Sequence, residues 1–239
     1  MNTGAVVVTY QTPNRLFQSC LASLRISGIQ DISVTNNTQE NNPGFATAAN
    51  KGAARLTNKY LLFINPDATL APGALAVAQE YLEHRPTVGI VGFLLNSPGG
   101  QLETMSFGPP VTPVSLITRH LTKSTVPARP APVGWVSAGA LIVRHRLFKQ
   151  LGGFDPQFFL YWEDVDLCRR ALAAKYQVVL HPGAQAIHQR GASLLDNCRR
   201  TKLYDQSADK YFRKHYPKMI CLMVRSARFL YRLLSPRAL

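Results

Sequence analysis

The sequence has few cysteines and no apolar run that could cross a membrane. Its cysteines, Cys20, Cys168, Cys198 and Cys221, have no close spacing. That pattern excludes a disulfide-rich scaffold and a cysteine-based zinc site, and it predicts reduced thiols in a cytosol. The longest apolar run near the C-terminal end covers only residues 219–224, whereas a membrane-spanning helix needs about 18 apolar residues. Residues 1–4 lack the positive charge of a secretory signal peptide, so we expect a cytoplasmic protein.

Acidic residues are also scarce. The chain has 13 Asp and Glu but 27 Lys and Arg, which gives a net charge of +14. The excess is uneven. Residues 1–188 hold 15 basic and 10 acidic side chains, whereas residues 189–239 hold 12 basic and 3 acidic ones. Such an asymmetry predicts an anionic partner for the C-terminal part, either nucleic acid or an anionic membrane surface.

The remaining composition is that of a folded domain. Hydrophobic residues make up 46% of the 239 positions and charged residues 17%, which excludes a disordered chain and allows one domain with an appendage. Apolar β-branched runs alternate with helical periodicity, and this predicts an α/β fold with a single mostly parallel sheet flanked by helices. We expect strands at 5–10, 29–34, 60–64, 88–94, 135–143 and 177–180, and helices at 14–24, 45–56, 72–84, 146–151 and 163–175.

Polar segments follow three of these strands, at residues 9–11, 35–37 and 65–67. Ligands of open α/β sheets bind beyond the carboxyl ends of the strands. We therefore expect these three segments to form one site.

Residues 96–133 contain seven prolines and no regular pattern. Long loops of this kind are often lids or substrate-binding segments. The prediction for this stretch is an irregular excursion from the domain.

Asp67 follows a buried strand directly after Pro66. A carboxylate in that place can hold Mg²⁺ or Mn²⁺, which take one or two carboxylates together with phosphate oxygens. The same residues also suit an ordinary turn with a capping aspartate.

Three carboxyl groups open the helix predicted after the apolar run 158–162, at Glu163, Asp164 and Asp166. One interpretation is that these acids only begin a helix, where negative charge interacts favourably with the helix dipole. Because they follow such an apolar run, we also expect at least one of them to be partly desolvated, with a raised pKa suited to a general base. His188, after the last predicted strand, can bind a metal or a diphosphate, or it can be structural.

Taken in order, these segments form a series of motifs. The first block consists of residues 6–10, Asn42-Pro43-Gly44-Phe45 and residues 62–67. The second block is the continuous string Gly152-Gly153-Phe154-Asp155-Pro156-Gln157-Phe158-Phe159-Leu160-Tyr161-Trp162-Glu163-Asp164-Val165-Asp166-Leu167-Cys168-Arg169-Arg170. It is followed by His188 and Gly191. The series resembles the family 2 glycosyltransferases, in particular their rhamnosyltransferase-like branch, over residues 5–193. The resemblance implies a GT-A fold, a nucleotide-diphospho-sugar donor, a divalent cation (Mg²⁺ or Mn²⁺) and inversion at the anomeric carbon. It also implies a glycan or lipid-linked acceptor in cell-surface polysaccharide assembly, with rhamnose the favoured sugar.

The resemblance also implies roles for residues. Asp67 and His188 would hold the cation, and Asp164 would be the base that takes the proton of the acceptor hydroxyl, with Glu163 orienting the acceptor or tuning Asp164. The nucleotide-sugar pocket would be lined by Thr9, Tyr10, Asn36, Asn42, Gly44, Asn50, Asn65, Gly139 and His188. One departure is Thr35, which stands where the family usually has an aspartate that contacts the nucleotide.

The basic C-terminal part lies outside most of the resemblance. We expect a glycosyltransferase domain over 1–193, with 96–133 on its acceptor side, and a basic helical extension over 194–239. Lys218, Arg225 and Arg232 recur every seven residues among apolar side chains. A cationic helix with an apolar face suits the surface of an anionic membrane, which would place the protein peripherally at the inner face of the cell membrane through residues 210–239. The alternative is that this helix packs its apolar face on the domain and leaves its basic residues in water.

Two other functions compete with the transferase reading. A sugar nucleotidyltransferase needs a Gly-rich basic phosphate loop after its first strand, and residues 9–13 lack one. A basic membrane- or nucleic-acid-binding module without catalysis is the other alternative. Nucleic acid is not an expected partner, since the tail carries no recognisable recognition module.

Overall fold

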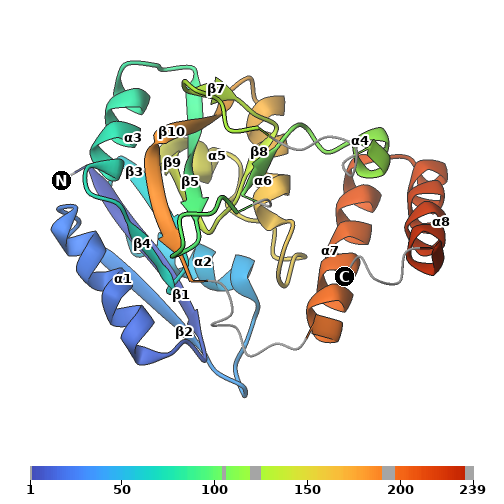
Figure 1. Cartoon of the computed structure of the whole chain (residues 1–239), viewed down its shortest axis with the longest axis horizontal. Helices are drawn as coiled ribbons and strands as arrows, with labels where there is room; N and C mark the ends of the chain where they lie inside the picture. The colour runs from blue at the N-terminus through green and yellow to red at the C-terminus, as the bar shows by residue number, and fades with distance from the viewer. Residues whose placement is uncertain (1, 104–105, 119–124, 190–196, 235–239) are drawn as a thin grey trace.

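The computed structural model describes residues 2–103, 106–118, 125–189 and 197–234. Its centre is an eight-stranded sheet with helices on both faces (Figure 1). The strands are β1 (Thr3–Tyr10), β2 (Ile32–Asn37), β3 (Tyr60–Ile64), β4 (Ala68–Leu70), β5 (Val88–Asn96), β7 (Ala131–Pro132), β9 (Ala140–Arg144) and β10 (Gln177–His188).

Along the sheet the order is β2-β1-β3-β9-β5-β10-β4, with β7 paired to β10. Strand β1 pairs in parallel with β2 and β3, and β5 pairs in parallel with β10. Strand β9 lies antiparallel between β3 and β5, so β1, β2, β3, β5 and β10 all run in one direction. The predicted α/β fold with a mostly parallel sheet is confirmed.

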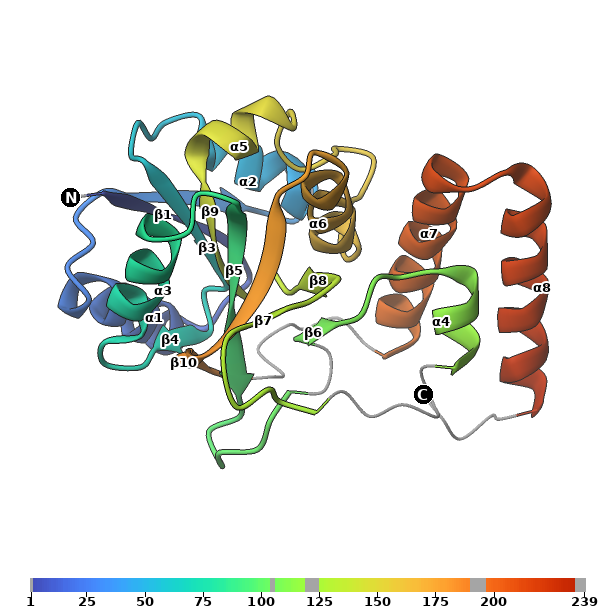
Figure 2. The same cartoon turned by 90° about the horizontal axis from the view of Figure 1, so that it is seen from above.

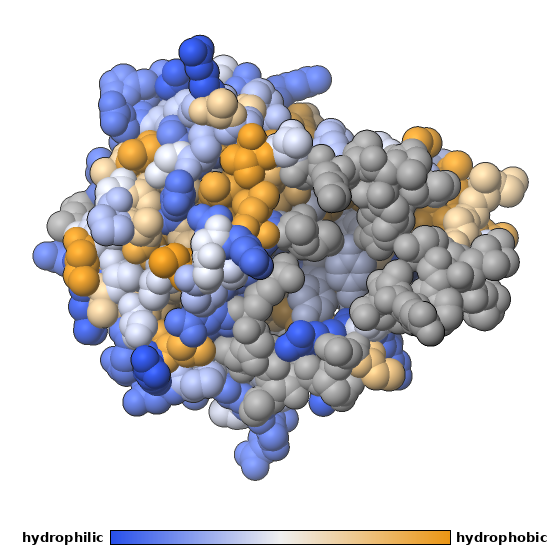
Figure 3. All heavy atoms as spheres, viewed as in Figure 1, coloured by the Kyte–Doolittle hydropathy of each residue, from blue (hydrophilic) through white to orange (hydrophobic). Residues whose placement is uncertain are grey.

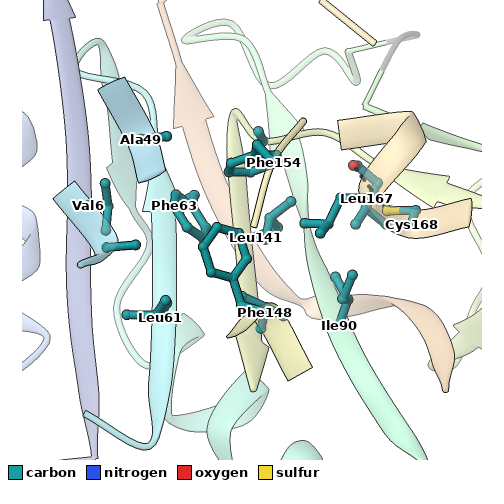
Figure 4. Packing of buried hydrophobic residues seen from close by; sticks show 14 of the residues in the cluster. Val6, Ala49, Leu61, Phe63, Ile90, Leu141, Phe148, Phe154, Leu167 and Cys168 are labelled. Atoms are coloured by element: carbon teal, nitrogen blue, oxygen red, sulfur yellow. Dashed lines mark hydrogen bonds between the residues drawn. The ribbon is translucent and has the colours of Figure 1, made fainter. Parts of the chain in front are cut away.

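Helices cover both faces of the sheet (Figure 2). Helices α1 (Asn14–Ile26) and α3 (Ala74–Glu83) lie on the first face, and α2 (Phe45–Ala53), α5 (His145–Gln150) and α6 (Glu163–Ala173) on the second. The buried strands β1 and β3 are apolar on both sides because each side meets a helical layer. Figure 4 shows the second layer, where Phe63 packs against Phe148 and Phe154 with ring centroids 5.0 and 4.8 Å apart.

Three strands differ clearly from their predicted extents. Strand β2 covers Ile32–Asn37, three residues later than the predicted 29–34. The segment predicted as one strand over 135–143 is divided into β8 (Trp135–Val136) and β9, and residues 137–139 lie between them without a strand. Strand β10 continues to His188, well beyond 180, because its last residues pair with β4, which the sequence did not predict.

The segment 96–133 has little regular structure in its described part. It contains the two-residue strands β6 (Phe107–Gly108) and β7 and the short helix α4 (Pro113–Thr118). Strand β6 pairs with β8 in a separate small sheet.

Two helices follow the domain, α7 (Asn197–His215) and α8 (Lys218–Leu234). Helix α7 packs against the segment that leads into α6, where Tyr211 and Phe212 join Phe158, Trp162 and Val165 in a buried cluster. In Figure 2, α8 stands outside α7 and next to α4. Among the helices that the structure describes, none is both long enough and apolar enough to pass through a bilayer. Gly191 and the start of the predicted extension, residues 194–196, lie outside the described residues.

Candidate active site

The carboxyl ends of β1, β2, β3 and β10 meet at one edge of the sheet, as expected for the polar segments that follow them. Thr9 and Asn36 are register partners on β1 and β2, and the Thr9 hydroxyl donates to Asn36 Oδ1 at 2.8 Å. Asn37 donates to Asn42 Oδ1 at 3.1 Å, and the same oxygen accepts the backbone N–H of Gly44 at 3.0 Å. These bonds fix the polar loop 38–43 beside the end of β1, where Tyr10 is also partly exposed.

Asp67 and His188 lie face to face at this edge. Oδ1 of Asp67 is 3.1 Å from Nε2 of His188, and Nδ2 of Asn65 is 3.2 Å from the same ring nitrogen. The antiparallel pairing of His188 with Ala68, and the bond from Gln189 N–H to the Asp67 carbonyl at 3.0 Å, hold the two segments together. The residues that the sequence proposed for a cation are thus adjacent.

Glu103 also belongs to this group and was missed by the sequence analysis. Its Oε1 lies 2.8 Å from His188 Nδ1, and its side chain is 6% exposed. Burial alone would lower the pKa of His188, but the bonds to Asp67 and Glu103 outweigh it and raise that pKa to about 9. Glu103 lies in the Pro-rich segment, where no local pattern distinguishes it from a loop glutamate.

Two hydrogen bonds connect the Asp67 and His188 group, through residues 137–139, to the carboxyl groups at the start of α6. The Asn65 N–H donates to the Gly139 carbonyl at 3.0 Å, and the Ala138 N–H donates to Asp164 Oδ2 at 3.0 Å. The unpaired segment 137–139 therefore touches the Asp67 loop on one side and the start of α6 on the other. Asp67 and Asp164 stand at the same edge of the sheet, although they are almost a hundred positions apart.

At the start of α6, Glu163 is buried and Asp164 is partly buried. Burial raises the pKa of Asp164, against the opposing effect of the N–H groups of Ala138 and Val165 that it accepts. Burial and the neighbouring charge of Asp164 raise the pKa of Glu163 well above its usual range. Oε2 of Glu163 has no hydrogen-bond partner among the described residues. The expected desolvation of this acidic group is confirmed.

The backbone just before these acids is unusual. Tyr161 and Trp162 have φ values of 67° and 70°, in the left-handed region that bulky residues rarely adopt. The preceding turn is fixed by α2, since Phe45 N–H donates to the Phe159 carbonyl at 2.7 Å. Gly44 has φ +88°, and a Cβ there would lie 2.5 Å from that carbonyl oxygen. Gly44 thus permits close approach of protein backbone, whereas the sequence analysis assigned it to the nucleotide pocket.

Asn50 has a similar internal contact. Its amide donates to the Phe154 carbonyl at 2.7 Å and accepts the Phe154 N–H at 2.9 Å. Both ends of this side chain therefore connect α2 to the loop before α6. Thr9, Tyr10, Asn36, Asn42, Asn65, Gly139 and His188 lie at the strand ends that form the site.

The third acid of the run has a different environment. Asp166 has no exposed side-chain surface and pairs with Arg170 at 2.7 Å on α6, and with His215 at 2.7 Å and Lys214 at 2.8 Å on α7. Burial would raise its pKa, but these partners lower it to about 2. The connection from α6 to α7 was not predicted from the sequence.

Helix α8 divides its apolar side chains between two sides. Val224 is buried in the cluster with α7, with Ile220 and Cys221 partly buried beside it. Met219, Leu222 and Met223 are 73%, 65% and 63% exposed. Figure 3 shows hydrophobic surface at the end of the molecule formed by α8. Lys218 and Arg225 are exposed, whereas Arg228 pairs with Asp205 and Asp209 of α7.

Comparison with known proteins places these observations in a family. The chain is 29% identical over 176 residues to the N-acetylglucosaminyl-diphospho-decaprenol L-rhamnosyltransferase of Mycobacterium tuberculosis, a match that covers 64% of the chain and 57% of that protein. It is 28% identical over 136 residues to the rhamnosyltransferase WbbL of Escherichia coli, covering 54% of the chain and 52% of that protein. The chain thus spans little more than half the length of these relatives.

A solved structure is similar over most of the chain. GalNAc-T7, crystallised with UDP, GalNAc and Mn²⁺, matches 89% of the chain and 50% of its own length with a TM-score of 0.62 and 13% identity. That likeness identifies the fold as GT-A. The model of the family described as "Glycosyltransferase like family 2" matches residues 4–207, and the chain therefore belongs to the family 2 glycosyltransferases.

Proposed function

We propose that this glycosyltransferase moves a sugar, with rhamnose favoured, from a nucleotide-diphospho-sugar to a hydroxyl of a glycan or lipid-linked acceptor in cell-surface polysaccharide biosynthesis. The observation that carries the proposal is the set of bonds from Asn65 to Gly139 and from Ala138 to Asp164. These bonds connect the group that we propose for the cation, through residues 137–139, to the partly buried Asp164 carboxylate. The names of the two bacterial rhamnosyltransferases support the choice of sugar.

A divalent cation fits the Asp67 group. The Asp67 carboxylate and the Asn65 amide both lie within 3.2 Å of the His188 ring nitrogen Nε2. No set of three His, Cys, Asp or Glu side chains in the described residues is arranged to hold a metal alone. Mg²⁺ and Mn²⁺ take one or two protein carboxylates and share the rest of their coordination with phosphate oxygens and water. When bound, the cation would neutralise the charge that develops on the leaving nucleoside diphosphate.

Asp164 would act as the general base. It would accept the proton of the acceptor hydroxyl while that oxygen forms a bond to the anomeric carbon and the bond to the diphosphate oxygen breaks. Attack from the side opposite the diphosphate inverts the configuration. The N–H groups of Ala138 and Val165 fix the direction of the carboxylate, and burial brings its pKa closer to neutral pH, where general bases are most effective.

Glu163 would orient the acceptor. Its buried Oε2 lacks a described partner, and its raised pKa keeps the carboxyl protonated over a wider pH range. A neutral carboxyl can both donate to and accept from a sugar hydroxyl. Satisfying this group when the acceptor binds would offset the cost of leaving it unpaired.

The nucleotide would bind along the ends of β1 and β2, at Thr9, Tyr10, Asn36 and Asn42. These side chains offer neutral donors and acceptors for base and ribose. Asn65 and Gly139 would line the diphosphate and sugar portion, beside His188.

We also propose that α8 binds an anionic membrane surface, peripherally and at the inner face of the cell membrane, where a lipid-linked acceptor would be found. Helices α7 and α8 together carry ten Lys and Arg and two Asp. The exposed side of α8 combines Met219, Leu222 and Met223 with the exposed Lys218 and Arg225. Apolar burial and cationic attraction act together in such helices.

The decisive experiment is a screen of nucleotide-sugars for protection against thermal unfolding, with and without Mn²⁺, followed by a transfer assay with the best donor. We expect one donor to give a Mn²⁺-dependent rise in Tm, and Asp67→Ala to lose that rise. The control is Asp31→Ala, whose carboxylate pairs with Asn58 on the surface. Protection that is the same with and without Mn²⁺ would contradict the cation assignment, and no protection by any donor would contradict the proposed function.

A further inference from the structure

Glu103 is held in place by the turn that follows β5. The Gly100 N–H donates to the Ser97 carbonyl at 2.9 Å, and the Ser97 N–H donates to the Gln101 carbonyl at 2.7 Å. Asn96 and Leu102 form an isolated bridge, and the Glu103 N–H donates to the Leu95 carbonyl at 2.9 Å. The chain thus turns back along the end of β5 and brings Glu103 to the strand edge that carries His188.

The C-terminal side of Glu103 is also bonded. The Ser106 hydroxyl donates to the Glu103 carbonyl at 2.8 Å, and the Ser137 N–H donates to the Ser106 carbonyl at 2.8 Å. These bonds connect Glu103 to the segment 137–139, which also contacts Asn65 and Asp164. Its side chain is 6% exposed. A buried carboxylate is costly unless it is paired and hydrogen-bonded, and His188 supplies such a partner for Glu103.

The two nitrogens of His188 face two different acids. Nδ1 is 2.8 Å from Glu103 Oε1, and Nε2 is 3.1 Å from Asp67 Oδ1. An ionised carboxylate only accepts hydrogen bonds, so Glu103 requires a proton on Nδ1. To bind a cation the ring must give up its other proton, and with the first one kept on Nδ1 by Glu103 the lone pair is then on Nε2, on the side of Asp67 and Asn65.

Resting on the proposed function, we propose that Glu103 is a positioning residue for the cation. It holds the His188 ring in the orientation and tautomer that point the Nε2 lone pair at the ion, and it makes that nitrogen a better ligand. Carboxylates that accept the second N–H of a metal-bound histidine act in this way, and their loss typically weakens metal binding about 10–100-fold. In this role Glu103 acts on the cation only through His188, the ring it contacts.

The test is a Mn²⁺ titration followed by electron paramagnetic resonance, on the full chain without substrate and again with UDP. We expect Glu103→Leu to weaken Mn²⁺ binding about 10–100-fold. Glu103→Gln keeps an acceptor oxygen and should recover most of the affinity. The surface control Glu83→Gln, whose partner Lys59 is exposed, should bind as the wild type does.

A second measurement uses only the unsubstituted protein. Long-range ¹H–¹⁵N spectra at a pH above that of ring ionisation should show the His188 proton on Nδ1. A proton on Nε2, or unchanged Mn²⁺ affinity in Glu103→Leu, would overturn the inference, as would a wild type that does not bind Mn²⁺. A protein that binds Mn²⁺ as expected and transfers no sugar would refute the proposed function and leave the role of Glu103 intact.

Discussion

His215 Nε2 lies 2.7 Å from Oδ1 of Asp166, a residue just two positions after the proposed base. Lys214 approaches the same oxygen at 2.8 Å, and Arg170 occupies the other one. The last turn of α7 is therefore bonded to the first turn of the helix that carries Asp164. Helix α7 is therefore a part of the structure around the candidate active site.

Asp166→Asn should lower the free energy of unfolding by about 3 kcal/mol, because removing one member of a buried ionic cluster leaves the others uncompensated. Chemical denaturation measures this change. The control is Glu83→Gln, which breaks an exposed ion pair and should cost at most about 1 kcal/mol. Equal costs for the two variants would mean that the cluster does not connect the helices.

The same carboxylate should make stability sensitive to acid. Its pKa is lowered from 3.8 to about 2 in the folded protein. Its contribution is therefore complete above about pH 4 and is lost as the pH falls toward 2. The wild type should lose about 2 kcal/mol more than Asp166→Asn across this interval, as measured by denaturation at several pH values. Parallel curves for the two proteins would contradict the assignment.

Asp164→Asn should reduce kcat by about 100- to 10,000-fold, the usual contribution of a general base. The amide oxygen can still accept the Ala138 N–H, so the loop should keep its place and nucleotide binding should survive. Calorimetry with the nucleoside diphosphate and a transfer assay separate the two effects. Turnover within a few-fold of the wild type would refute the role of Asp164.

Leu222→Glu should reduce binding to anionic vesicles about tenfold or more, because it puts a charge among the exposed apolar side chains of α8. Co-sedimentation with phosphatidylglycerol vesicles measures the loss. Ile26→Glu is the matched control, since Ile26 is also exposed, at 83%, but lies at the end of α1. A similar loss in both variants would argue against a specific role of α8.

Gly44→Ala should destabilise the protein more than Gly73→Ala does. Gly73 is in the left-handed helical region, where an alanine costs about 1–2 kcal/mol. Gly44 has φ 88° and ψ 167°, in a region that is essentially restricted to glycine. A Cβ at Gly73 meets nothing within 4 Å, whereas one at Gly44 would collide with the backbone of Phe159. Thermal unfolding compares the variants, and equal losses would show that the contact between α2 and the Phe159 turn adjusts freely.

The sequence predicted the parts of the fold that depend on local pattern. β1 and β3 are uninterrupted apolar runs, and both appear where expected because helical layers bury both of their faces. The extension of β10 to His188 was missed, since it depends on pairing with β4, far away in the sequence. The interruption at 137–139 was missed for a similar reason, because the Ala138 N–H is used by the distant Asp164 and the Ser137 N–H by Ser106.

For the site, the motifs identified residues that do gather at one edge, such as Asp67, His188 and Asp164. What the motifs could not supply were tertiary partners. Glu103 reaches His188 only through a turn in an irregular segment, and Asp166 finds its partners on α7. The contacts of Gly44 and Asn50 with the loop before α6 are likewise long-range, so their residue types alone suggested a ligand-facing role.

The three residues between β8 and β9 have a final consequence. Because they pair with no strand, the Ala138 N–H is available to Asp164 and the Gly139 carbonyl to Asn65. In the proposed reaction, a single stretch of main chain would thus set the spacing between the donor half, at Asp67, and the acceptor half, at Asp164. Lengthening or shortening this stretch by one residue would separate the two halves while leaving every acid in place.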